Sequence, residues 1–261
     1  MARAEAVLSD ACRVLTTLRE SARVGHIGFP VDALAAVEGF VLLHSHKGAA
    51  LVGFESGHGA AFRVLRRGGG GTSEGGAEGG AEQAGPEAGG FALSAPVFVK
   101  LSKWAVGIQL GYSNVYSLLA FFHGGQLERL LAGGKQIIVG EDFEVSGLPL
   151  VGQEPTQRTF HKTVMHGVDG SAEAAAASAD ITAALASEAQ EVRLLTVSES
   201  LMVFDLSMYG GSLAVDADLM DEAYGKGHAV LDVLHGNVLV PEHLKPLAAR
   251  VAGEMAALTA L

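Results

Sequence analysis

Apolar side chains recur every three or four residues near the start of the chain. This spacing places them on one side of an α-helix, with charged residues on the other side. It therefore predicts an amphipathic helix within residues 1–28, which Gly25 and Gly28 can end and after which Pro30 can start a short second helix reaching about Glu38. The apolar positions of the first helix are Val7, Leu8, Ala11, Val14, Leu15, Leu18 and Ala22.

Short apolar runs separated by turn-forming residues follow, as is typical of antiparallel strands. The runs "FVLLHSH", "AALVGFE" and "AAFRVLRR", split by "KG" and "SGHG", predict three strands. Residues 104–111 and 115–122 predict two more, joined by a turn at 112–114. A helix is expected at "GGQLERLLAGG", a hairpin from "KQIIVG" and "EDFEVSG", and strands at "VRLLTVSES", "LMVFDLS" and "GSLAVDADL". A proline-started helix, "PEHLKPLAARVAGEMAALTAL", closes the chain.

Two segments interrupt this pattern. Residues 68–90 are rich in glycine and glutamate, and residues 153–191 lose periodicity and end in an alanine-rich tract. Such segments have little apolar surface with which to offset their ordering entropy, so we expect disordered insertions, although the alanine-rich tract also fits a surface helix. The remaining pattern predicts an α+β fold: a mainly antiparallel, glycine-rich β-barrel or sandwich core with helices at both termini.

Composition and charge argue against some kinds of partner and cellular location. The 261 residues carry a formal net charge of −11, which argues against a nucleic-acid partner. The single cysteine allows no internal disulfide, and the N-terminus lacks the unbroken apolar core of a signal peptide, so a cytoplasmic location is expected. The apolar stretch at 104–122 contains Gln109, Ser113 and Asn114, which fits strands better than a membrane span.

Catalytic and metal-binding patterns are weak. The sequence "GYSNV" has Asn114 where a nucleophile elbow needs its second glycine, so we expect no enzyme and no cofactor. His44 and His46 alternate along a predicted strand and would point the same way, with His58 on a neighbouring strand. These three could bind Zn²⁺, but strand histidines are more often ordinary hydrogen-bonding groups, so no metal is expected.

Several motifs, taken in order, resemble the SYLF family of lipid-binding domains. They are "FPVDALAAVEGFVLL", "KGAALVGFESGHGAAFRV", "LSAPVFV", the sequence Gly-Ile-Gln-Leu-Gly at 107–111 followed by "YSNVYSLLAFF", and "DLMDEAYG". The resemblance implies a β-rich domain over residues 29–225, preceded by the helix at 1–28 and followed by a helical tail at 226–261 packed on the same domain. The chain departs from the family at Glu38, where a lysine is usual.

The resemblance implies a non-enzymatic, peripheral membrane module that binds anionic phosphoinositide lipids through its first helix and a basic patch. Leu15 and Leu18 would enter the bilayer, while arginines beside the stripe and a cluster around Lys47 and Arg63 would meet lipid phosphates. The arginines are Arg3, Arg13, Arg19 and Arg23. Two alternatives stay open: the stripe can dock on the β core instead, and the chain can be an actin-binding or membrane-trafficking scaffold that binds protein.

Overall fold

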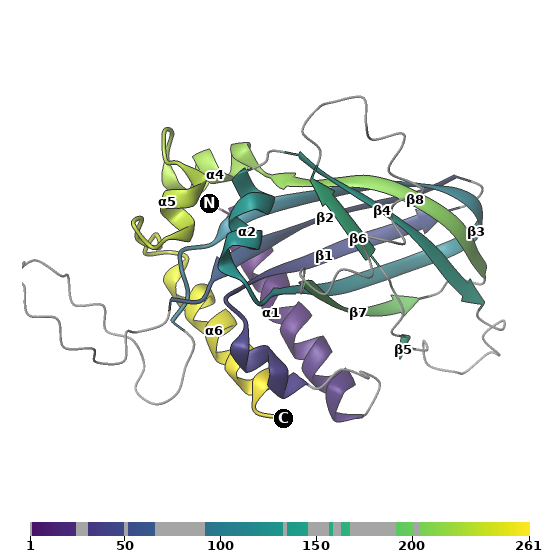
Figure 1. The fold of residues 1–261 in the computed structure, drawn as a ribbon, viewed down its shortest axis with the longest axis horizontal. Helices are drawn as coiled ribbons and strands as arrows, with labels where there is room; N and C mark the ends of the chain where they lie inside the picture. Colours follow the sequence, from purple (N-terminus) through teal and green to yellow (C-terminus); the bar gives the residue numbers. More distant parts are fainter. Residues whose placement is uncertain are drawn as a thin grey trace, which may run out of the picture.

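The computed structural model describes residues 2–24, 31–49, 52–65, 92–132, 135–145, 157–158, 163–167, 192–200 and 204–261. Within them, eight strands form one sheet and helices lie at both ends of the chain, which confirms the α+β class (Figure 1). The predicted insertion at 68–90 lies outside the described residues, and within 153–191 only two short strands are described.

The elements follow one another as helices at both ends of a run of strands. In chain order they are α1 (Ala2–Arg23), the 3₁₀ helix η1 (Val31–Ala36), β1 (Gly39–Ala49), β2 (Val52–Arg63), β3 (Val97–Phe121), α2 (Gly124–Ala132), β4 (Lys135–Val145), β5 (Gln157–Arg158), β6 (Thr163–Gly167), β7 (Val192–Ser200), β8 (Phe204–Val215), α4 (Ala217–Tyr224), α5 (Val230–Leu234) and α6 (Lys245–Thr259).

The long strand β3 organises the sheet because its two halves pair with different strands. Residues 97–106 pair with β2 and residues 99–110 with β8, whereas residues 111–121 pair with β1 and residues 113–121 with β7. The β1–β2 hairpin therefore lies inside the bend of β3. Gly111, where the second half begins, has φ 139°, a backbone conformation that L side chains rarely adopt.

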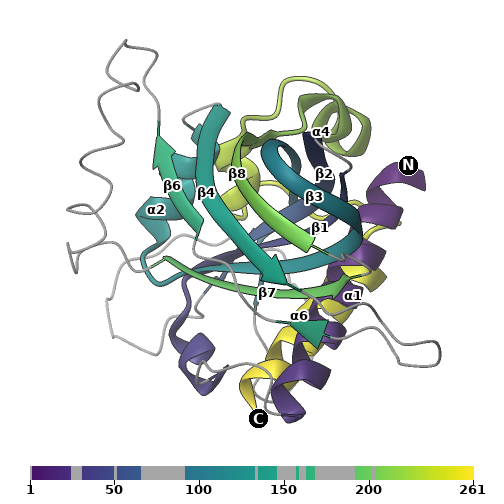
Figure 2. The same ribbon diagram turned by 90° about the vertical axis from the view of Figure 1, so that its right-hand side faces the viewer.

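The sheet curls strongly without closing (Figure 2). From the first half of β3 it continues through β8 and β4 to β6, and from the second half through β7 to β5. All of these pairs are antiparallel. No pairing among the described strands joins β6 to β5. The sheet therefore does not close into a barrel, which was one of the two predicted forms of the core.

Several predicted turns are continuous strand instead. The motif at 56–59 lies inside β2, so two of the three predicted strands are one. A Cβ at Gly59 would stand 1.9 Å from the carbonyl oxygen of Leu42, and one at Gly57 would stand 2.4 Å from that of His44. These glycines therefore allow close approach of β1 and β2 and do not turn the chain. Likewise, residues 112–114 continue β3, and the last two predicted strands merge into β8. Of the hairpin predicted at 135–147, the described residues 135–145 form the single strand β4.

Helices α1 and α6 pack together on one face of the sheet (Figures 1 and 2). The predicted apolar stripe of α1 is buried there, between the sheet and α6, and belongs to one hydrophobic core that continues into α4, α5 and α6. The C-terminal helix α6 begins at Lys245, four residues after the proline that was expected to start it, and α5 was not predicted. No helix in the described residues is long and apolar enough to cross a membrane.

Candidate functional site

The sheet face that meets α1, called here the helix-side face, changes character along its strands. Directly opposite residues in antiparallel strands share a face, so the register defines rows across it. Near the start of β1 the rows are apolar and buried, with Phe40, Leu42, Phe62 and Leu118 among their members. Further along β1 the same face turns polar, and the polar rows hold the candidate site.

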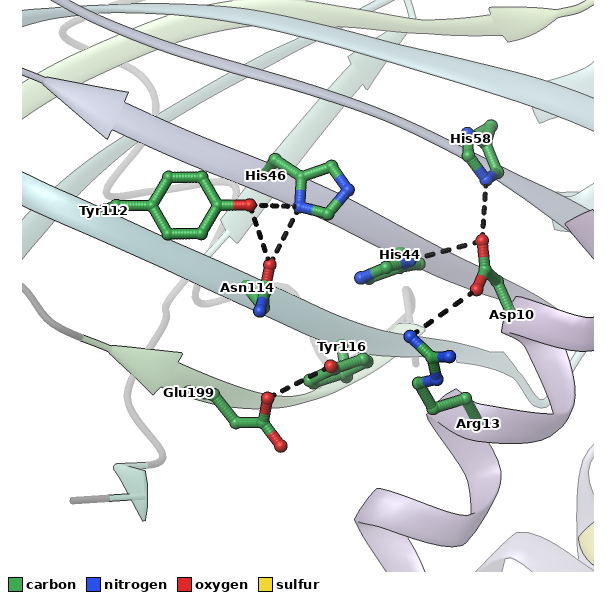
Figure 3. A network of polar contacts seen from close by, with 9 residues as sticks. All are labelled: Asp10, Arg13, His44, His46, His58, Tyr112, Asn114, Tyr116 and Glu199. Carbon is green, nitrogen blue, oxygen red and sulfur yellow. Dashed lines mark hydrogen bonds and ion pairs between the residues drawn. The ribbon is translucent and has the colours of Figure 1, made fainter. Parts of the chain in front are cut away.

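The first polar row joins α1 to the sheet. His44 on β1 lies opposite His58 on β2 and, on its other side, opposite Tyr116 on β3. Asp10 of α1 points at this row (Figure 3): its Oδ2 atom lies 3.0 Å from His58 Nε2 and 3.3 Å from His44 Nδ1. Tyr116 stacks on His44 with their rings parallel to within 2°. One helical carboxylate is thus shared by two histidines from adjacent strands.

The second polar row is more open to solvent. The atoms His46 Nδ1, Asn114 Oδ1 and the Tyr112 hydroxyl lie 2.8 to 3.0 Å from one another (Figure 3). His46 shares the face of His44, with ring centroids 4.7 Å apart, so the predicted common direction of these two histidines is confirmed.

Tyr116 of the first polar row also contacts β7. It donates a hydrogen bond to Glu199, and burial together with that carboxylate raises the pKa of Tyr116.

Protonation in the first row follows from burial. Burial lowers the pKa of His44, and the neighbouring Asp10 opposes this effect without overcoming it. Burial alone would raise the pKa of Asp10, but its contacts with His58 and His44 outweigh burial and hold that pKa below the ordinary value. The arrangement therefore favours a neutral imidazole at His44 beside an ionised carboxylate.

An aromatic row follows the polar rows on the helix-side face. Trp104 on β3 lies opposite Phe54 on β2, and the ring of Phe54 lies next to Gly48 on β1. Gly48 lies opposite Tyr112, which is also on β3. The three rings, called here the aromatic row, are 66%, 55% and 46% exposed for Trp104, Phe54 and Tyr112. They lie near the arrowhead of β1, at the end of the sheet remote from α2, α4 and α5 (Figure 1).

The opposite face of the same strands carries a buried ionic cluster. Glu55 accepts a hydrogen bond from Ser45 at 2.5 Å and one from Lys103 at 3.1 Å. Burial alone would raise the pKa of Glu55, but the charges of Lys103 and Lys47 and the two hydrogen bonds outweigh burial and lower it. Ser45, Lys47 and Glu55 are all buried, so the cluster serves the fold and offers no surface for a ligand.

The helix residues assigned to a membrane lie in different surroundings. Leu15 and Leu18 are fully buried in the core. Arg3 forms ion pairs with Asp216 and Glu222 of the α4 region, and Arg19 lies 2.6 Å from Glu254 of α6. Arg13 is 61% exposed and lies 3.9 Å from Asp10 Oδ1. Arg23 is exposed at the end of α1. The structure therefore has the alternative arrangement, in which the apolar stripe of α1 docks on the β core.

The expected basic cluster around Lys47 and Arg63 does not form. In the β1–β2 register Arg63 lies opposite Gly39, whereas Lys47 lies eight residues further along β1, which is about 26 Å away. Lys47 is buried near Glu55, and Arg63 pairs with Glu128 of α2. The two cations therefore belong to opposite ends of the sheet.

Sequence reasoning missed Asp10 and the aromatic row. Asp10 precedes the histidines by 34 residues or more and counted only as a charge on the polar side of a helix. Trp104 was placed in a predicted strand and Tyr112 in the turn after it, whereas β3 continues through both. The signal in the sequence was strand alternation, which places Phe54, Ser56 and His58 on one face of β2.

Comparison of this chain with family models, with curated proteins and with solved structures gives no match. The resemblance to the SYLF family therefore stays a prediction based on the quoted motifs.

Proposed function

We propose that this chain is a non-enzymatic, peripheral membrane-binding protein that contacts the bilayer interface through its aromatic row. The observation that carries the proposal is the exposure of Trp104, Phe54 and Tyr112 side by side at one end of the sheet. Tryptophan and tyrosine prefer the membrane–water interface because each has an apolar body and a polar tip. The SYLF resemblance favours the same class of function.

The aromatic row is a better membrane contact than α1. The apolar stripe of α1 is already buried, and fully burying each large apolar side chain is worth about 1.5–3 kcal/mol. Moving the helix into lipid would only exchange one apolar environment for another, while exposing the sheet and α6 beneath it. The aromatic row is exposed already and requires no such rearrangement.

The polar rows lie at a suitable depth to meet lipid headgroups. Two residues along a strand span about 7 Å, and the headgroup layer on each side of a bilayer is roughly 5–8 Å thick. With the aromatic row at the edge of the acyl chains, His46 and Asn114 would therefore lie among the headgroups. The exposed cations Lys100 and Arg13 lie behind them and would favour anionic lipids such as phosphoinositides.

Trp104, the sole tryptophan of the chain, gives a direct test because its fluorescence reports the environment of the row. The purified chain is mixed with vesicles of neutral lipid, and with vesicles that also contain a phosphoinositide. We expect a blue shift, quenching by lipids brominated in their acyl chains, and stronger binding to the anionic vesicles that high salt weakens.

Variants separate the row from the rest of the surface. Phe54→Ser and Tyr112→Ser should each weaken vesicle co-sedimentation by about four- to tenfold, since roughly half of each ring is exposed and half of a full apolar burial is about 0.8–1.5 kcal/mol. The matched control is Leu239→Ser, at an apolar residue 63% exposed near α5. Unchanged Trp104 emission with both vesicle types would refute the proposal and favour a protein partner such as actin.

A further inference from the structure

We propose that Asp10, His44 and His58 form a binding site for a Zn²⁺ ion, which attaches α1 to the β1–β2 hairpin. One carboxylate oxygen and one nitrogen from each histidine lie within 4.8 Å of one another. The three ligands come from α1, β1 and β2, so a bound ion would connect a helix to two strands. A carboxylate with two imidazoles is a common ligand set for Zn²⁺. This proposal is independent of membrane binding.

The spacing of the ligand atoms suits a tetrahedral metal. With metal–ligand bonds of about 2.0–2.1 Å, neighbouring ligand atoms stand about 3.3 Å apart. Asp10 Oδ2 lies 3.3 Å from His44 Nδ1 and 3.0 Å from His58 Nε2. The nitrogens of the two histidines lie within 4.8 Å of each other, so the imidazole rings would have to rotate toward each other for all three atoms to reach one ion.

His44 provides a second, independent observation. Its side chain is only 6% exposed, and neither of its ring nitrogens makes a hydrogen bond within the described residues. Nδ1 approaches Asp10 closely, but without the alignment of a hydrogen bond. Buried polar atoms are nearly always satisfied in folded proteins, so an unpaired imidazole nitrogen 3.3 Å from a carboxylate oxygen indicates a missing partner. A metal ion between them supplies it.

The surroundings hold the ligands ready. Tyr116 stacks on His44 and fixes its ring plane. Arg13 lies 3.9 Å from the other oxygen of Asp10, Oδ1, and is 61% exposed, so it can turn toward solvent when a cation binds. His58 is 40% exposed, which lets solvent reach a fourth coordination position.

The test measures metal binding by the full chain. Protein stripped with a chelator is titrated with Zn²⁺ by calorimetry, and with Co²⁺, whose visible absorption reports the coordination number directly. We expect one ion per chain and a higher melting temperature with Zn²⁺ than without it. A chain that takes up less than half an equivalent of Zn²⁺ would overturn the proposal.

Three variants assign the ion to this site. His58→Asn and Asp10→Asn should each weaken Zn²⁺ binding by about 100-fold or more, since even residues that only support a metal ligand typically contribute 10–100-fold. His123→Asn makes the same change at an exposed histidine outside the cluster and should leave affinity unchanged. Circular dichroism checks folding, and the half-exposed His58 keeps the test valid if Asp10→Asn does not fold. Equal affinity in His58→Asn and the unaltered chain would refute the assignment.

Discussion

Replacing Glu55 by glutamine tests the buried ionic cluster with minimal change of shape. Glutamine keeps the size of the side chain and a carbonyl oxygen that accepts hydrogen bonds, but it removes the negative charge. The Glu55 and Lys103 side chains are 9% and 16% exposed, so the lysine would be left with little water around it. Lys47, also buried beside them, would lose the same charge.

The expected loss is large for an isosteric change. Removing one partner of a buried ion pair costs about 3–5 kcal/mol, because the remaining charge stays desolvated while an opposite charge beside it is lost. The partial exposure of Lys103 places the estimate at the lower end, about 3 kcal/mol. Urea denaturation followed by circular dichroism measures the change in the free energy of unfolding.

Two comparisons make the result interpretable. Glu242→Gln makes the same change in an ion pair with Lys245 that is 87% exposed on its glutamate side, and exposed pairs contribute only about 0–1 kcal/mol. Combining Glu55→Gln with Lys103→Met removes both charges and should cost less than the two single changes added together. If Glu55→Gln lowers the free energy of unfolding by less than about 1 kcal/mol, the cluster is not the buried charge network described above.

Two further predictions concern stability. Gly59→Ala should destabilise the fold by about 1–3 kcal/mol because its Cβ would meet the backbone of Leu42. Gly253→Ala in α6 has open space around the new Cβ and should stabilise the fold by about 0.5–1 kcal/mol. Urea denaturation of both variants tests whether the two changes in unfolding free energy have opposite signs. The pKa of Glu55 lies below the ordinary value of 4.5, so its contribution to stability is complete above that pH and is lost as pH falls through the lower folded-state pKa. The difference in unfolding free energy between the unaltered chain and Glu55→Gln should therefore shrink below about pH 4.5, and a difference that stays constant down to pH 2 contradicts the assignment.

Helical periodicity predicted α1 well, because a repeat of three to four residues has one geometric explanation over 22 residues. The second predicted helix, bracketed by glycine pairs, is α2. Strand boundaries were less predictable. Gly57 and Gly59 have the same sequence signature whether they turn the chain or let two backbones approach, and only the neighbouring strand distinguishes the cases. The polar residues after Gly111 look like a turn but pair with β1 and β7.

The candidate site was predictable only where it follows strand alternation. That rule placed His44 and His46 on one face and His58 on the next strand. It carries no information about what packs on that face, so the approach of Asp10 from α1 could not be foreseen. In the same way, an apolar helical stripe has the same pattern whether it covers a sheet or enters a bilayer, and the burial of Leu15 and Leu18 became evident only in three dimensions.

The bend of β3 also determines how the chain can fold and how it avoids aggregation. Both outer edges of the β1–β2 hairpin pair with one strand, so neither edge is open to a second molecule. The second half of β3 pairs with β7 about 80 residues later, a contact of long sequence range that should slow folding. Because the entropy of closing a loop grows only logarithmically with its length, the connections between the elements that lie between β3 and β7 can lengthen at little cost in stability. Length variation among related chains should therefore concentrate in those connections, while the link between β1 and β2 stays short.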